Sequence, residues 1–200
     1  MAMLLVATLL GGCTAVTMVT SLRDSEAIEP GEGAGLVIVG FSYSGEPSTF
    51  PLRPKCPIQP IAIPTAVPPR SVEIGRFDEA GKIRPLDSIW ALHGNCSKVT
   101  PDEPVKYNFL HLPAATYAIQ GIRSLDLMNR SRLLDPPAFT VKAGDVIYVG
   151  DVVIDSLYPR SIIISRTPDA AKAALAKRNG PIDRFVNFST SGSTVYSVVH

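Results

Sequence analysis

Short runs of β-branched and aromatic residues recur along most of this chain, and proline, glycine or aspartate separates each run from the next. Such runs are typical of strands, and 18 prolines and 15 glycines leave few stretches in which a long helix could form. The pattern predicts a mainly β domain in which the strands form an antiparallel β-sandwich. The expected strands are 36–41, 71–77, 82–84, 88–92, 106–112, 116–123, 139–142, 146–154 and 161–166.

One segment near the carboxyl end has the pattern of a helix. Thr167 is a suitable N-cap, Pro168 suits the first helical position and Asp169 complements the amino-terminal dipole. Strong helix formers follow, and Asn179-Gly180 is a typical end. We expect a single short helix over about residues 168–179, followed by one or two strands in the tail.

The first third of the chain lacks this regular alternation. Residues 14–33 are small and polar with scattered acids, which predicts a flexible tether, and the domain is expected to span 35–200. Eight prolines lie within 47–70, several at Pro-x-x-Pro spacing, and favour an extended insertion over paired strands. A loop of this length inside a compact domain is typical of a functional or disordered segment.

The amino terminus resembles a bacterial lipoprotein signal. An apolar stretch over 3–10 leads into Leu10-Gly11-Gly12-Cys13, which looks like a lipobox. The resemblance implies a signal peptide over 1–12, cleavage before Cys13 and acylation (palmitate) of that residue. Thr14 follows where an aspartate would retain the protein at the inner membrane, so the resemblance implies the outer membrane. Each buried methylene of the acyl chains contributes roughly 0.8 kcal/mol to anchoring.

Two other interpretations of the amino terminus stay open. No Lys or Arg precedes the apolar stretch, and only twelve residues precede the cysteine. The segment could be an ordinary secretory signal cut after Ala15, or a hydrophobic strand of a cytosolic protein. A membrane-spanning helix is not expected, because glycines and threonines interrupt residues 1–22.

The two remaining cysteines form an even pair if Cys13 carries lipid. In an oxidising compartment we expect Cys56 and Cys96 to form a disulfide, with two unpaired thiols as the alternative. Closing a loop of that length would stabilise the fold by about 4 kcal/mol on the chain-entropy model.

Two further segments resemble small transthyretin-like or carboxypeptidase-regulatory-like β-sandwich domains, which some bacterial lipoproteins of unknown function carry. Residues 112–117, Leu-Pro-Ala-Ala-Thr-Tyr, resemble the Leu-x-Pro-Gly-x-Tyr hairpin of these domains, with Ala115 where the family has glycine. Residues 139–150 resemble their second strand pair, with Gly144 at a turn that needs positive φ. The resemblance implies two hairpins and a fold but no activity. Tyr117 and Tyr148 are expected to be core or edge aromatics.

The charge balance and the motifs exclude several classes of function. The net charge is +1 and 18% of residues are charged, so there is no basic field for nucleic acid. No Gly-x-Ser-x-Gly motif occurs. His93 and Cys96 could form a nucleophile pair oriented by Asp87 or Asp102, but their local sequence matches no such enzyme and a disulfide is favoured.

Metal and anion sites are also not expected. His93, His111 and His200 lie far apart in the sequence and are interpreted as surface or structural residues. Asp145, Asp151 and Asp155 could form a weak calcium site, but we interpret them as acids that cap strand ends and keep an edge soluble. The basic cluster Arg123, Arg130 and Arg132 could meet a phosphate or an acidic partner, but we expect it to lie in a solvated loop.

The sequence therefore predicts an outer-membrane lipoprotein with no catalytic, cofactor or metal site. Its expected role is to contact or scaffold another envelope component, through the proline-rich insertion or an exposed sheet edge. The alternative is a module that binds a small molecule, peptide or glycan, because loops at one end of a sandwich often bind in this way. An enzyme, hydrolytic if anything, is the least favoured class.

Overall fold

The computed structural model describes residues 22, 28–43, 70–83, 89–93, 105–124, 130–154, 161–187 and 192–199. These residues are mainly β with one short α-helix, which confirms the predicted class. No helix among them is both long and apolar enough to cross a membrane. The elements are β1 (Ala34–Tyr43), β2 (Arg70–Arg76), β3 (Ile89–His93), β4 (Lys106–Pro113), β5 (Ala115–Ser124), β6 (Arg130–Leu133), β7 (Ala138–Val141), β8 (Val146–Ile154), β9 (Ser161–Arg166), α1 (Pro168–Lys177), the 3₁₀ turn η2 (Ile182–Arg184), β10 (Phe185–Asn187) and β11 (Gly192–Val199).

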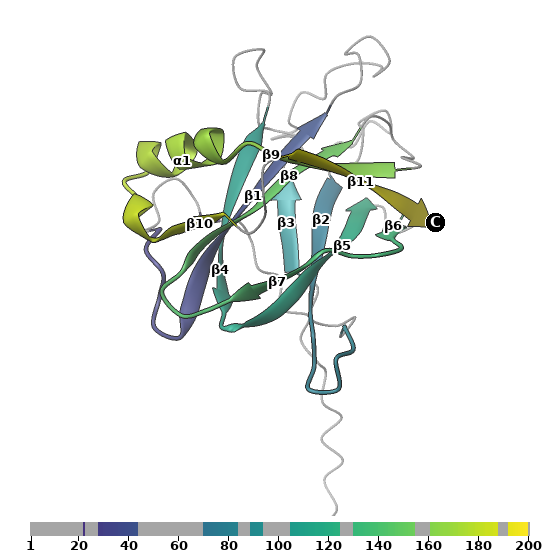
Figure 1. Ribbon diagram of the computed structural model, residues 1–200, viewed down its shortest axis with the longest axis horizontal. Coiled ribbons are helices and arrows are strands. Elements are labelled where there is room, and N and C mark those ends of the chain that lie inside the picture. Colours follow the sequence, from purple (N-terminus) through teal and green to yellow (C-terminus); the bar gives the residue numbers. More distant parts are fainter. Residues whose placement is uncertain are drawn as a thin grey trace, which may run out of the picture.

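The strands form one continuous sheet that curls on itself (Figure 1). Its order is β3-β2-β5-β6-β11-β9-β8-β1-β4, with β7 paired to β5 and β10 paired to β8. Most pairs are antiparallel, but β8 runs parallel to both β1 and β10. The sheet is therefore mixed, and the expected sandwich of two antiparallel sheets is not confirmed.

Neither of the two expected hairpins forms as a pair of adjacent strands. β4 pairs with β1, whereas β5 pairs with β2, β6 and β7. β8 pairs with β1, β9 and β10, so β7 and β8 are not partners either. The turns at Ala114 and Gly144 are corners, because the two strands that each turn joins pair with different neighbours. The Tyr117 hydroxyl braces the first corner by donating to the Pro113 carbonyl at 2.8 Å, and Gly144 has the expected positive φ of 83°.

Both faces of β1 are buried, in agreement with its continuous apolar sequence. Val37, Val39 and Phe41 face the interior of the curled sheet, and Leu36 and Ile38 face the opposite side. α1 covers that outer side with Ala171 and Leu175, which are fully buried. Tyr117 belongs to the inner cluster and Tyr148 to the outer one, so both are core residues as expected. The outer cluster consists of Ile28, Leu36, Ile38, Phe109, Val146, Tyr148, Ala171 and Leu175.

The helix begins at the predicted residue and ends close to the predicted one. Pro168 occupies its first turn, and Asn179 follows the helix with a φ of 55°. A Cβ on Gly180 would lie 2.2 Å from Leu175 Cδ1, so a side chain here would require buried residues of the outer cluster to shift. The predicted side-chain cap does not form, because the Thr167 hydroxyl has another partner on β8.

Burial begins before β1. Ile28 is 3% exposed and belongs to the outer cluster, and the partly buried Leu22 packs against the same cluster. Some residues expected in a flexible tether therefore pack on the domain, at the side that α1 covers.

Candidate functional site

A β-bulge in β8 creates the most unusual polar cluster in the described residues. Ile38 pairs with Tyr148, but the next β1 residue, Val39, pairs with Gly150, so Val149 is an extra residue. A bulge re-aims the side chains that follow it. Tyr148 and Asp151 consequently share the outer face, although residues three apart in a regular strand point to opposite faces.

Gly40 makes room for Asp151. The two residues are direct cross-strand partners, and Gly40 also pairs with Tyr107 on its other side. A Cβ on Gly40 would lie 1.9 Å from Asp151 Oδ1 and 2.8 Å from Val105 Cγ1. The absence of a side chain at Gly40 thus allows a fully buried carboxyl group to lie against the sheet.

Thr167 connects this carboxyl group to the start of α1. Its hydroxyl donates to Asp151 Oδ2, and its backbone N–H donates to the Tyr148 hydroxyl at 3.0 Å. The Tyr107 hydroxyl lies 3.2 Å from Thr167 Oγ1, and the two tyrosine rings meet edge to face at 6.4 Å. Asp151 Oδ1 is buried without a hydrogen-bond partner. The cluster therefore joins β4, β8 and the start of α1 through polar groups that are hydrogen-bonded except for Asp151 Oδ1.

Burial dominates the electrostatics of the cluster. Desolvation raises the pKa of Asp151, and the hydrogen bond from Thr167, together with the nearby hydroxyls of Tyr148 and Tyr107, opposes that rise. Desolvation also raises the pKa of Tyr107 to about 12 and that of Tyr148 further. The nearby carboxyl group adds to both tyrosine shifts. Asp151 has no exposed surface and accepts a hydrogen bond from Thr167, so it holds the start of α1 against the sheet.

The expectation that Asp151 caps a strand end and keeps an edge soluble is wrong. It lies within β8, which has strand partners on both sides. Because of the bulge, the spacing of six residues no longer puts Asp145 and Asp151 on the same face of the strand. No group of three or more His, Cys, Asp or Glu side chains suited to a metal occurs in the described part of the chain. A cue in the sequence was Gly40, an isolated glycine within a strand.

The other predicted residues fall into two groups. Cys13, Cys56, Cys96, Asp87, Asp102, Asp155 and His200 lie outside the described residues, as do the signal peptide and nearly all of the 47–70 insertion. His93 ends β3, and the half-buried His111 on β4 has a buried Nε2 without a hydrogen-bond partner. Arg123, Arg130 and Arg132 lie on β5 and β6, with Arg123 and Arg130 as register partners, so the prediction of a loop was wrong.

A row of apolar side chains crosses the outer face beyond the helix. Val195 on β11 pairs with Ile163 on β9, and Ile163 pairs with Val153 on β8. Val152, Ile162, Ile164 and Tyr196, which flank them along the strands, belong to the inner cluster or pack against it, so Val195, Ile163 and Val153, here called the outer apolar row, point outward. Val195 is 65% exposed. Register-paired serines border the row on both sides, at Ser161–Ser197 and Ser165–Ser193.

Two more exposed apolar residues lie near the end of β11. Leu134, which follows β6, is 59% exposed, and its N–H donates to the Ser197 carbonyl at 3.1 Å. Val199 is the last residue of β11 and is also exposed. Together with the outer apolar row they give this end of the sheet an apolar surface, and such surfaces are typical of contacts with other molecules.

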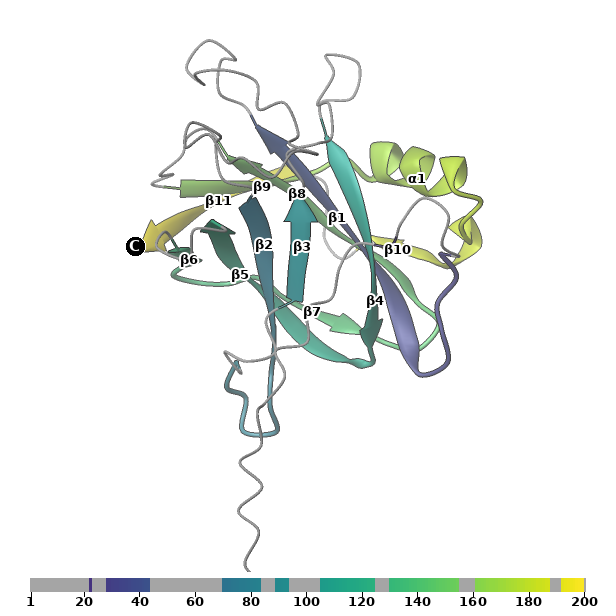
Figure 2. The ribbon, with the colours of Figure 1, turned by 180° about the vertical axis from the view of Figure 1, so that it is seen from behind.

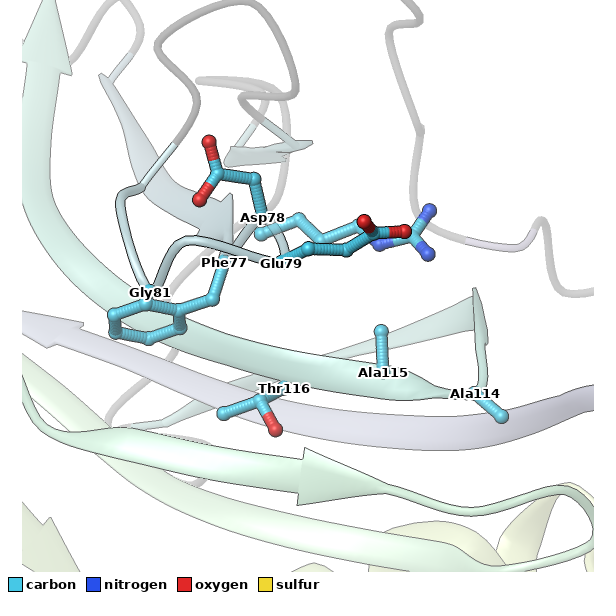
Figure 3. A pocket seen from close by; sticks show the side chains of 8 residues that line it. Phe77, Asp78, Glu79, Gly81, Ala114, Ala115 and Thr116 are labelled. Atoms are coloured by element: carbon cyan, nitrogen blue, oxygen red, sulfur yellow. The ribbon is translucent and has the colours of Figure 1, made fainter.

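A shallow hollow of about 530 Å³ lies between the turn after β2 and the corner that starts β5 (Figure 3). Asp78 shapes the turn, because its Oδ1 accepts from the N–H groups of Ala80 and Lys82 at 3.0 and 2.8 Å. The hollow has charged, aromatic and small residues in its wall. They are Arg76, Phe77, Asp78, Glu79, Gly81, Ala114, Ala115 and Thr116.

No protein-family model matches the chain, and no curated protein or solved structure matches it.

Proposed function

We propose that this protein is a non-catalytic lipoprotein of the bacterial cell envelope, anchored at the outer membrane through Cys13, that contacts or scaffolds another envelope component. The run Leu10-Gly11-Gly12-Cys13, followed by Thr14, supports the anchor. The partner is another envelope protein, and the near-neutral charge gives no reason to invoke nucleic acid.

The observation that carries the contact role is the outer apolar row. Covering Val195 would remove apolar surface from water, and each square ångström of such surface contributes roughly 25 cal/mol. The bordering serines offer hydroxyls that remain satisfied by water or by a polar partner. The row crosses three neighbouring strands on a sheet face, which suits it to a protein surface better than to a small molecule.

The buried cluster around Asp151 supports a non-catalytic role. Its hydrogen bonds tie Thr167 to β8 and keep the first turn of α1 in place. A carboxyl group that is fully buried and hydrogen-bonded in this way stabilises the packing of α1 on the sheet.

The anchor is tested by the intact mass of the protein extracted from membranes with detergent, with and without reduction and alkylation. We expect a mass that starts at Cys13 and includes acyl chains, with two cysteines alkylated only after reduction. A mass without lipid would overturn the anchor, and alkylation without reduction would overturn the Cys56–Cys96 disulfide.

The contact role is tested by crosslinking in intact cells, followed by purification of the lipidated protein. Val195→Lys places a charge in the outer apolar row and is expected to abolish a stoichiometric complex. The matched control Ala138→Lys changes an exposed strand residue on β7, outside the row, and should leave the complex unchanged. Equal recovery of the partner with both variants would refute the proposed surface.

The hollow near Asp78 favours a second candidate, a module that binds a small molecule, peptide or glycan. Arg76, Asp78 and Glu79 provide charged groups beside the apolar Phe77. A ligand that binds only the folded state raises the melting temperature. The test is a thermal-shift screen with envelope sugars and peptides, in which Arg76→Ala should remove any shift.

A further inference from the structure

The chain is attached to the domain well before β1. The Leu22 backbone N–H donates to the Phe109 carbonyl of β4 at 2.8 Å, and Arg178 Nη1 donates to the Leu22 carbonyl at 3.3 Å. Arg178 also lies over the Phe109 ring, 5.0 Å from its centre. Ile28 is buried nearby, where a Cβ on Gly180 would come within 2.8 Å of its Cδ1. Leu22 is therefore fixed at the C-terminal end of α1.

This attachment shortens the tether from Cys13. Leu22 lies only nine positions after Cys13, whereas the start of β1 lies 21 positions after it. Nine residues reach at most about 32 Å when fully extended. They have a typical end-to-end distance of roughly 17 Å when flexible. A compact domain of this size is roughly 40 Å across. Because this reach is shorter than the domain, the end of the domain opposite Leu22 cannot lie against the lipid.

The surface next to Leu22 has the chemistry of a lipid-facing one. Residues 168–187 carry four basic and two acidic side chains, a net charge of +2, and the exposed Glu29 next to Ile28 lowers the net charge of this surface to +1. Lys172, Lys177 and Arg184 are exposed. Ile182 beside them is 46% exposed. Basic groups together with exposed apolar side chains favour contact with anionic headgroups.

We propose that the surface formed by α1, η2 and the attached Leu22 lies against the membrane that holds the lipid anchor. This inference rests on the proposed anchor at Cys13. It gives the domain a fixed orientation, because α1 and β10 lie at one end of the molecule and the end of β11 lies at the other (Figures 1 and 2). The outer end of β11 then points away from the lipid, where a partner can reach it.

The test uses the full-length lipidated protein in vesicles of phosphatidylethanolamine and phosphatidylglycerol. A membrane-impermeant acetylating reagent is added, and mass spectrometry measures the reactivity of each lysine. Lys172 and Lys177 on α1 are compared with Lys82, which is exposed on the turn after β2. We expect the two helix lysines to lose most of their reactivity relative to Lys82 in vesicles, and to regain it in non-ionic detergent.

Two variants test the attachment itself. Leu22→Asp should restore the reactivity of Lys172 and Lys177 while the protein still floats with the vesicles. The matched control Leu134→Asp, at the opposite end, should leave them protected, and circular dichroism should show that both variants are folded.

The outcomes separate the two proposals. A protein that floats with the vesicles while Lys172 and Lys177 react as fast as in detergent refutes the orientation and leaves the anchor standing. Protection that persists in Leu22→Asp refutes the role of the attachment. A protein that does not float and carries no lipid refutes the anchor and, with it, this inference.

Discussion

The buried carboxyl group of Asp151 should make the stability of this protein depend on pH in an unusual direction. Desolvation raises its pKa above the ordinary value of 3.8, so the folded state holds the proton more tightly than the unfolded state. Its contribution to stability is fully present below pH 3.8 and is lost as the pH rises through the folded-state pKa. Most carboxylates in ion pairs have a lowered pKa in the folded state, so their contribution to stability is lost as the pH falls.

The perturbation is Asp151→Asn, which mimics the protonated side chain and cannot titrate. Between pH 3.8 and the raised pKa, the unfolding free energy of the wild type should fall relative to that of the variant. One proton gives a slope of at most about 1.4 kcal/mol per pH unit. Above the folded-state pKa the difference should be constant, with the variant at its greatest relative advantage.

The assay is urea unfolding at a series of pH values, followed by circular dichroism, with both proteins measured in the same buffers. The control Asp135→Asn removes an exposed carboxyl group and should change the unfolding free energy by less than about 0.5 kcal/mol. A wild-type stability that rises relative to Asp151→Asn over this window would show that hydrogen bonding outweighs burial. If the difference in unfolding free energy between the two proteins does not change with pH, Asp151 has the same pKa in the folded and unfolded states.

Three further substitutions test the packing. Gly40→Ala should lower the free energy of unfolding by about 1–3 kcal/mol, because its Cβ would overlap Asp151 Oδ1. In a double-mutant cycle with Asp151→Ala, the double variant should lose less stability than the two single variants added together. Leu175→Ala should cost about 2–5 kcal/mol in urea unfolding, because Leu175 is fully buried between α1 and the sheet, whereas the exposed Ala176→Ser should cost far less. Tyr117→Phe removes the hydrogen bond to the Pro113 carbonyl and should lower the free energy of unfolding by about 0.5–1.5 kcal/mol. An unchanged melting temperature would show that this bond does not stabilise the corner.

Features that depend on neighbouring residues could be predicted from the sequence. The helix begins at Pro168 because proline suits a first turn, and it ends before Asn179, which adopts positive φ. Gly144 has the positive φ that its turn requires, and both faces of β1 are buried as its apolar sequence suggests. These properties follow from local backbone preferences and from side-chain alternation.

Pairing between distant strands was decided by the tertiary structure. Alternation shows which face of a strand is buried, but it does not name the neighbouring strand, so β4 and β5 were wrongly expected to pair. The candidate site depends still more on distant contacts. Asp151 is buried because a bulge re-aims it, Gly40 leaves space across the pair, and Thr167 arrives from the following strand. The sequence alone determined the β class, the helix and the turns, because each depends on a few adjacent residues. Only the tertiary structure brought Gly40, Asp151 and Thr167 together, because their contact requires the register of three separate segments.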